Sequence, residues 1–332
     1  MPGPTLNDIA RELGVSKMTV SRALRGGRHV AGDLHEKILR TAAALGYQPD
    51  PEIAKLMTHM RRRRQTASTR SLAFIWAERS SQEIEQSSWS QQLVLGARQQ
   101  AQRLGFELEE FHLAARGMSG RRLSGILEAR GIPGFVLSPL ISRSRGHVSM
   151  QWEKFCSVVI GLGYARPALH RVHHHHYLGM MTALRMLRKR GVKRIGFYCG
   201  STINERMFRA WSASFLAHHP LARPGGLLAL RKTPSRTDFL GWLDKERPEV
   251  VIDSGHVVLP WLESLQQAQR PRHITLAWRS DLPASAGIDQ QAAVLGAAAV
   301  DLLVAQYQQN ERGVPATPKI VMTEGVWRPA QD

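Results

Sequence analysis

The first 25 residues contain two short amphipathic segments on either side of Gly14. Thr5 and Asp8 form the [ST]-x-x-[DE] pattern that is typical of a helix start. Gly14 stands where a tight turn between helices needs a positive φ, which glycine reaches without a Cβ clash. Ser16 is suited to cap a second helix. The apolar residues recur at helical spacing: Ile9, Ala10 and Leu13 in the first segment, and Val20, Ala23 and Leu24 in the second.

The second segment has a polar and basic face that nothing in the pattern buries. Its members are Lys17, Met18, Ser21, Arg22 and Arg25. Asp33 and Glu36 indicate the start of a third helix, and Gly46 its end. This layout is typical of a helix-turn-helix, whose second helix enters the DNA major groove. The alternative is a surface helical hairpin with solvated charges, and three capped helices with one open basic face argue against it.

The run Thr5-Leu-x-Asp-Ile-Ala-x-x-x-Gly-Val-Ser-x-x-Thr-Val-Ser-Arg22, followed by Leu45-Gly-Tyr-x-Pro49, is long and specific. It resembles the lactose-repressor-like (LacI/GalR) family of bacterial transcription regulators. Shorter C-terminal stretches, such as Gly287–Gln290 and Asn310–Pro315, resemble a subgroup of this family less distinctively. The resemblance implies an all-α helix-turn-helix domain over residues 1–49, a hinge helix and basic linker over 50–70, and an effector-binding and dimerisation domain over 71–332.

The same resemblance implies which residues of the head meet DNA. Base contacts fall on Lys17, Met18 and Arg22, and Arg22 suits a bidentate contact to guanine. Phosphate contacts, which fix register without reading sequence, fall on Ser16, Thr19, Ser21, Arg25 and His29.

The family places a leucine in the minor groove from its hinge helix, and Leu56 matches it. Asp50, where asparagine is usual, and Pro51 depart from the family's pattern. Leu56 could instead pack within a dimer. The run Arg61–Arg64 can be interpreted as a solvated linker or as a segment that lies along phosphates.

The chain carries 45 Lys and Arg against 27 Asp and Glu, a formal charge of +18. Residues 1–70 hold 13 basic and 6 acidic side chains, so +7 lies in the head and linker and +11 in the rest. The basic head favours a polyanionic partner whose affinity falls with salt. The surplus in the body exceeds what a neutral ligand requires and has no explanation in the pattern.

The compartment follows from what the sequence lacks. The opening residues contain no apolar stretch typical of a signal peptide, and no run of 18 apolar residues occurs. Cys156 and Cys199 cannot make a disulfide framework and are expected to be buried thiols. We therefore expect a cytoplasmic protein without a membrane partner.

From residue 71 onward, short apolar runs alternate with helical patterns, which predicts parallel sheets with helices on both faces. Two such series predict an α/β body of two Rossmann-like lobes, and the resemblance implies a periplasmic-binding-protein-like arrangement with a cleft between them. We expect one lobe over about 71–162 and 287–315, and the other over about 163–286 and 316–332. The elements expected in the second lobe include helices over 177–190, 205–218 and 259–267.

The resemblance makes Arg206 the main candidate for contact with an effector, because relatives place an arginine at this helix start. Its guanidinium suits sugar hydroxyls or a carboxylate, whereas Arg209 is interpreted as a surface charge. Further candidates lie near expected strand ends: Ser80, Trp89, Ser138, Asp253 and Trp278.

The segment Arg171-Val-His-His-His-His-Tyr177 departs from the family. Four adjacent histidines invite a metal site, but no cysteine or carboxylate lies beside them and consecutive residues diverge around a helix. We expect instead that one or two line the cleft or a dimer surface, where their charge changes near neutral pH.

No catalytic motif stands out: the sequence has no G-x-S-x-G, phosphate loop, H-E-x-x-H or G-x-G-x-x-G at the first strand–helix turn. We expect a regulator, a repressor by family precedent, rather than an enzyme, with no cofactor and no metal. It would bind a pseudo-palindromic operator as a homodimer, and a sugar or sugar derivative would control its affinity. The alternatives are a ligand-modifying enzyme or a solute-binding protein fused to a DNA-binding head.

Overall fold

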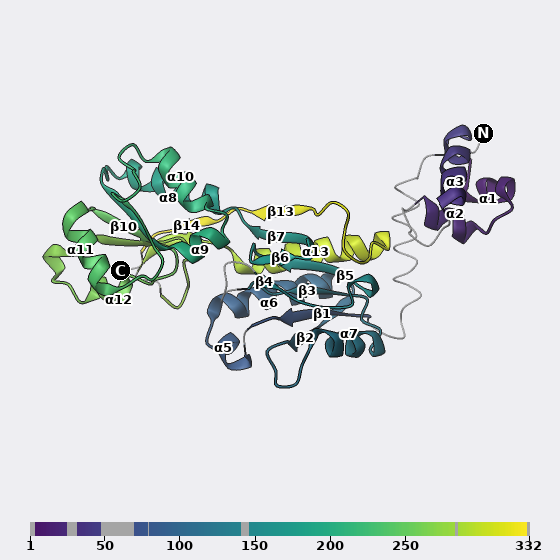
Figure 1. The fold of residues 1–332 in the computed structure, drawn as a ribbon, viewed down its shortest axis with the longest axis horizontal. Helices are drawn as coiled ribbons and strands as arrows, with labels where there is room; N and C mark the ends of the chain where they lie inside the picture. The colour runs from purple at the N-terminus through teal and green to yellow at the C-terminus, as the bar shows by residue number, and fades with distance from the viewer. Residues whose placement is uncertain are drawn as a thin grey trace.

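The amino-terminal head is a three-helix domain. A computed structural model describes residues 4–24, 32–47, 70–78, 80–140, 146–282 and 285–330, and the fold is drawn in Figure 1. Helices α1 (Leu6–Leu13), α2 (Lys17–Ala23) and α3 (Gly32–Ala44) enclose a small core. Ile9, Val20 and Ile38, one from each helix, are fully buried at its centre.

The helix ends of the head confirm the predicted caps. The Thr5 and Asp8 side chains form a reciprocal capping box at the start of α1, and the Thr5 N–H donates to Asp8 Oδ2 at 2.8 Å. Gly14 ends α1 with φ +65°, and Gly46 follows α3 with φ +67°. Ser16 caps α2 by accepting a hydrogen bond from the Thr19 N–H at 3.1 Å.

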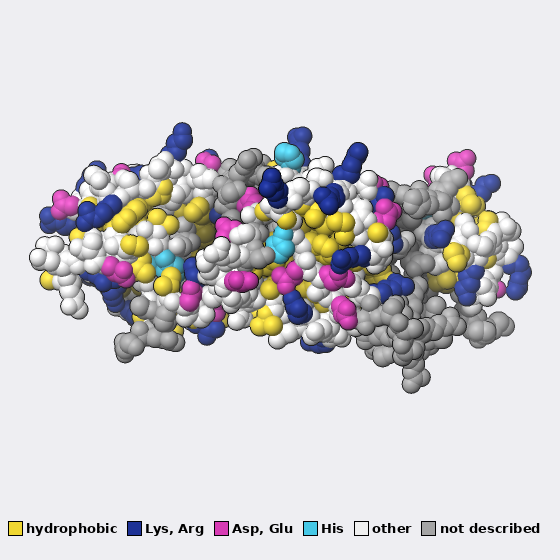
Figure 2. Space-filling view, turned by 90° about the horizontal axis from the view of Figure 1, so that it is seen from below, with side chains coloured by type: hydrophobic (Ala, Val, Ile, Leu, Met, Phe, Trp, Pro, Cys, Tyr) yellow, Lys and Arg dark blue, Asp and Glu magenta, His cyan; other side chains and the backbone are white. Residues whose placement is uncertain are grey.

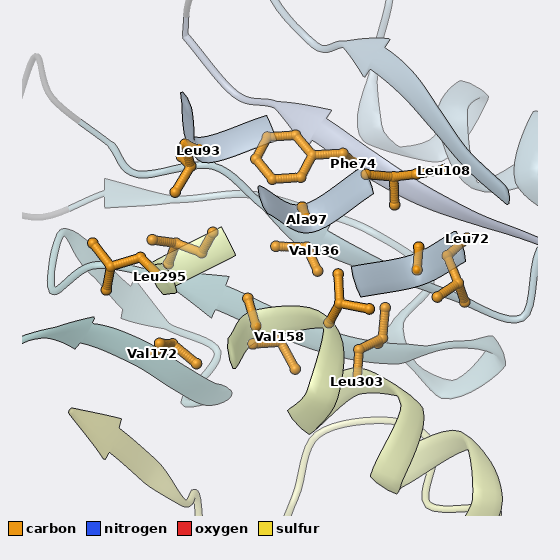
Figure 3. Close-up of a cluster of buried hydrophobic side chains, with 14 of the residues drawn as sticks. Leu72, Phe74, Leu93, Ala97, Leu108, Val136, Val158, Val172, Leu295 and Leu303 are labelled. Carbon is orange, nitrogen blue, oxygen red and sulfur yellow. The ribbon is translucent and has the colours of Figure 1, made fainter. Parts of the chain in front are cut away.

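The first sheet of the body has six strands in the order β13-β7-β5-β3-β1-β2, and every neighbouring pair is parallel. Helices α6 (Ser88–Arg103) and α13 (Ala292–Gln309) cover one face, where they enclose the core drawn in Figure 3. Helix α7 (Gly120–Ala129) packs on the other face, and α5 (Ser81–Glu85) precedes α6. The strands are β1 (Arg70–Trp76), β2 (Phe106–His112), β3 (Gly134–Leu137), β5 (Cys156–Ile160), β7 (His170–His174) and β13 (Ile320–Thr323).

The second sheet has the order β14-β12-β11-β10-β8-β9, parallel except for β14, which runs antiparallel to β12. Helices α8 (His176–Lys189) and α10 (Ala210–His218) pack on one face. Helices α11 (Arg236–Glu246) and α12 (Leu259–Glu263) pack on the other. The strands are β8 (Ile195–Gly200), β9 (Leu228–Arg231), β10 (Val250–Asp253), β11 (Arg272–Thr275), β12 (Ala286–Asp289) and β14 (Val326–Arg328). A small sheet pairs β4 (Gly146–His147) with β6 (Tyr164–Arg166). The predicted fold class, two α/β lobes after an all-α head, is confirmed.

The chain passes between the two sheets three times: from β7 to α8, from β12 to α13 and from β13 to β14. The passages expected near residues 162, 286 and 316 therefore lie farther along, after residues 174, 289 and 323. The reason is that β7 and β13 add to the open edge of the first sheet before the chain leaves it, and β12 pairs with β11 in the second sheet before the chain returns to the first. In Figure 1, β13 and β14 form a nearly continuous ribbon across the two lobes.

The helix expected over residues 205–218 is wrong as a single element. Phe208 and Arg209 have φ +50° and +59°, so the chain breaks into α9 (Ser201–Arg206) and α10. The buried Asn204 amide holds the break, because it donates to Ser212 Oγ at 2.9 Å and accepts from the Ser212 N–H at 3.4 Å. The helix expected over 259–267 is also shorter and ends at Glu263, before a 3-10 turn over Gln267–Gln269.

Candidate DNA-binding face and effector cleft

Helix α2 presents its predicted reading face to solvent. Lys17 and Arg22 are exposed, and Met18 is 61% exposed although it is apolar. Val20 and Ala23 on the opposite side are buried in the core of the head. An exposed methionine between two cations gains free energy from a partner that removes its side chain from water. The face therefore combines two charges with one apolar contact surface.

The predicted phosphate contacts lie at the amino-terminal end of this face and beyond it. Ser16 Oγ and Thr19 Oγ1 are 2.8 Å apart, so the two hydroxyls share a hydrogen bond beside the helix start. Ser21 is half-buried. Arg25, His29, Leu56 and the run Arg61–Arg64 lie outside the described residues, and their contacts remain predictions.

Arg206 ends α9 and reaches from the second lobe to the first. Its Cδ stands 3.6 Å from the position that a Cβ on Gly163 would take, and Gly163 follows β5 of the first lobe. Burial lowers the pKa of the Arg206 guanidinium, and the charge of Glu78, at the end of β1, opposes that shift. The structure thus brings the predicted arginine to the carboxyl ends of first-lobe strands, where ligands bind in open parallel sheets.

Three of the other effector candidates have local structural partners. Ser80 caps α5 in a capping box with Glu83. Ser138 Oγ accepts the Ala77 N–H at 3.1 Å. Asp253 is 1% exposed and accepts the backbone N–H groups of Gly255, His256 and Val258 at 3.2, 3.0 and 3.1 Å. These side chains shape the strand ends, and their contact with an effector stays a prediction.

The two candidate tryptophans come from different lobes. Trp89 lies in α6 and is half-buried against the first-lobe core. Trp278 follows β11, where its backbone N–H donates to the Ile288 carbonyl at 2.9 Å and the Arg328 guanidinium lies 5.6 Å from its ring centre. The buried Nε1 atom of Trp278 has no hydrogen-bond partner among the described residues.

Two residues of this region were not predicted. Glu78 lies two residues after β1, and the hydroxyl of Tyr164, the first residue of β6, donates to the Ser138 carbonyl at 2.6 Å. Their positions after buried strands were the available signal, since side chains there gather at one edge of a parallel sheet.

The histidine run forms the first passage between the lobes. His170–His174 is strand β7, the His175 ring caps α8, and the His175 N–H donates to the Thr323 carbonyl at 2.9 Å. His173, His174 and His176 are buried, and burial lowers the pKa of His174 to about 4. The expectation of histidines that line the cleft and titrate near neutral pH is therefore wrong for these three. Within the described ranges, no three histidine, cysteine or acidic side chains are placed to hold a metal ion.

The His174 ring is enclosed by all three passages. A Cβ on Gly325, between β13 and β14, would lie 2.6 Å from His174 Cε1 and 2.6 Å from Cγ2 of Ile288 in β12. Neither ring nitrogen of His174 has a hydrogen-bond partner in the part of the chain that is described. The three passages between the lobes thus pack around the His174 imidazole, whose neutral form is favoured by burial.

A hollow of about 570 Å³ opens on the first lobe between α5, α6 and β2. Its walls are mainly apolar and its rim carries charges, and Figure 2 shows apolar side chains gathered on the underside of the body. The lining residues include Ile84, Val94, Leu95, Arg98, Glu110 and His112. Leu95 remains 43% exposed at this surface.

The head is similar in sequence to known proteins. Residues 5–50 match the family described as "Bacterial regulatory proteins, lacI family". A curated relative, the HTH-type transcriptional regulator GntR of Pseudomonas aeruginosa, is 52% identical over 48 residues. The head is therefore similar to this family over residues 5–50. The match to the curated relative spans 14% of this chain and 14% of the relative, so it concerns the head alone.

The fold of the whole chain is similar to that of solved regulators. The transcriptional regulator CelR in complex with cellobiose has a TM-score of 0.58 at 19% identity, and the alignment covers 98% of both chains. The lac repressor dimer bound to operator and the anti-inducer ONPF has a TM-score of 0.53 at 16% identity, covering 99% of this chain and 98% of that one. These likenesses extend the comparison from the head to the two-lobed body at the level of fold. Among the described helices, none is both long and apolar enough to cross a membrane.

Proposed function

We propose that this protein is a sequence-specific DNA-binding regulator of transcription, acting as a repressor in the cytoplasm. The observation that carries the proposal is the exposed face of α2 in a head that matches the lacI family over residues 5–50. Lys17 and Arg22 would contact base edges from this face, and Met18 would contact a thymine methyl group. The hydroxyls of Ser16 and Thr19 would fix the helix on phosphates.

The two-lobed body would bind the effector between its sheets. Arg206 supports this assignment because it extends from α9 to the segment after β5, so one side chain faces both lobes. The solved complex of CelR holds cellobiose, and a sugar or sugar derivative is the proposed effector class here. Coupling between effector and operator would be worth about 1–3 kcal/mol and would act reciprocally.

The functional form would be a homodimer on a pseudo-palindromic operator, since two-fold protein symmetry requires matching symmetry in the DNA. The apolar hollow between α5, α6 and β2 is the proposed dimer surface. Its exposed Leu95 would be buried by the second copy, while Arg98 and Glu110 at the rim already pair with each other within the chain.

The proposal is tested by selecting duplexes from a random library with the full chain and measuring affinity for the selected site. The Arg22→Ala variant should lose roughly tenfold or more of its preference for that site over random DNA, because a bidentate base contact is worth about 1–3 kcal/mol. Arg40→Ala is the matched control, since Arg40 is exposed on α3 and pairs with Glu36 at 3.7 Å. Enrichment of no site by the wild-type chain would refute the proposed function.

A further inference from the structure

One hydrogen bond joins the two lobes at their surface. Ser88 Oγ donates to Asp281 Oδ1 at 2.6 Å. Ser88 is the first residue of α6 in the first lobe, and Asp281 lies in the loop after β11 in the second. The two residues are 193 positions apart in the chain, so the bond exists only while the lobes are in contact.

The Asp281 carboxylate, which accepts this bond, is held in place by a neighbouring arginine. Arg279, two residues upstream, donates from Nε to Asp281 Oδ1 at 3.0 Å and from Nη2 to Oδ2. A bidentate pair of this kind holds the carboxylate in one orientation. The Arg279 guanidinium and then the Ser88 hydroxyl lower the pKa of Asp281 to about 2, so the acceptor is charged throughout the physiological range.

The amino-terminal end of α6 adds a second attraction. Helix α6 has 16 residues and starts at Ser88, so the positive end of its dipole lies beside the Asp281 carboxylate. Charge, orientation and helix polarity therefore all favour contact between these two segments. The Arg279 and Asp281 side chains are 34% and 41% exposed, which keeps the contact weak enough to break.

The position of the contact relates it to the effector cleft. Ser88 precedes Trp89, and Arg279 follows Trp278, so the contact joins the two segments that carry the candidate tryptophans. We propose that Ser88, Arg279 and Asp281 form a clasp that holds the lobes together without effector and must open to admit it. This inference rests on the proposed function only in assuming that an effector binds between the lobes, because the clasp itself is a property of the body.

The test measures the separation of the lobes in the full chain without DNA or ligand. The separation is measured by pulsed electron paramagnetic resonance between two spin labels. The labels are attached at Gln102→Cys in α6 and Lys245→Cys in α11, which are exposed positions in different lobes. The native cysteines Cys156 and Cys199 are buried. The otherwise unchanged chain should give one short distance. Ser88→Ala should add a longer one, with the closed-to-open ratio falling roughly fivefold, as expected for an exposed hydrogen bond to a charged group.

A double-mutant cycle makes the result specific to the pair. In an Asp281→Ala background, Ser88→Ala should produce no further change in the distance distribution. Arg130→Ala is the control, since Arg130 pairs with Glu109 inside the first lobe and its side chain is more exposed than that of Arg279. An unchanged distribution in Ser88→Ala, or equal effects of Ser88→Ala with and without Asp281, would overturn the clasp. A chain that selects no DNA site but shows the distance change would refute the proposed function and leave the clasp standing.

Discussion

Gly96 of α6 and Gly296 of α13 are each pressed against the backbone of the other's helix. A Cβ on Gly96 would stand 2.0 Å from the Ala293 carbonyl oxygen, and one on Gly296 would stand 2.0 Å from the Leu93 carbonyl oxygen. Helix α13 enters the first lobe directly after the second passage between the lobes. This close crossing therefore fixes the returning chain on the sheet that carries the first wall of the cleft.

Replacing Gly96 or Gly296 with alanine should destabilise the body, because the new methyl group meets rigid backbone. Overpacking in a tight core costs about 1–3 kcal/mol of stability. Because the atoms nearest to the new methyl group are backbone atoms, we expect a cost at or above the upper end of that range. Urea unfolding of the full chain would measure the loss. Gly125→Ala in α7 is the matched control, since a Cβ there meets no atom within 4 Å. Its midpoint should rise slightly, and equal midpoints for Gly96→Ala and wild type would contradict the close crossing.

Asp253 should act mainly as a structural residue, although the sequence predicts it as an effector contact. Asp253→Ala leaves three backbone N–H groups without an acceptor, of which that of Val258 is buried, and removes the partner of His273, whose Nε2 lies 3.2 Å from Oδ1. We expect a loss of about 1–3 kcal/mol, as for leaving a buried hydrogen-bond donor unsatisfied. Asp244→Ala, at an exposed position of α11, is the control. Thermal unfolding checks the prediction, and a variant as stable as the control would contradict it.

The head could be predicted almost residue by residue because its determinants are local. Thr5, Gly14 and Ser16 act on groups within a few positions of themselves, and such caps leave a direct mark on the sequence. The basic face of α2 follows from the same helical spacing.

The body was predictable in its alternation of strands and helices, but its passages between lobes were not. Strand β7 consists largely of histidine and arginine, and their burial depends on strands β5 and β13 on either side. The break between α9 and α10 depends on Asn204 and Ser212, which meet only after folding. Polar residues that are buried by tertiary contacts carry no periodic apolar signal. Ser80 and Asp253 were placed correctly near strand ends, while their hydrogen-bond partners could not be read from spacing.

The buried His174 ring should make the protein sensitive to acid. Its folded-state pKa of about 4 lies below the ordinary value of 6.5, so the unfolded chain binds the proton more tightly. Stability is then full above pH 6.5 and is lost as pH falls from there toward 4, by up to about 3 kcal/mol at 1.4 kcal/mol per unit. His174→Leu, which removes this titrating ring, should reduce the fall in unfolding free energy between pH 6.5 and 4.5, leaving the part that comes from His173 and His176, whose pKa values are also lowered by burial. His147→Leu, at an exposed position, should leave the slope unchanged, and a wild-type slope in His174→Leu would show that the ring is not buried in solution.

Arg206 should couple the effector to the rest of the molecule. The side chain joins α9 of the second lobe to the segment after β5 of the first, so a ligand that contacts it would stabilise the two lobes together. A thermal-shift screen of the full chain against neutral and acidic monosaccharides and disaccharides should find a compound that raises the melting temperature. Arg206→Ala should weaken that compound roughly tenfold to a hundredfold, as expected for hydrogen bonds to a charged group in a partly buried site, and should leave operator affinity without ligand unchanged.

The control for Arg206 is Arg185→Ala, which removes a cation from an exposed position of α8 in the same lobe. If lowering the positive charge of the body were the cause, both variants would bind the compound equally weakly, because the attraction of an acidic compound depends on the electrostatic field of the whole protein. A contact in the cleft affects Arg206→Ala alone. An undiminished shift in Arg206→Ala would move the effector contacts to other strand ends, with Trp89 and Trp278 as the next residues to replace.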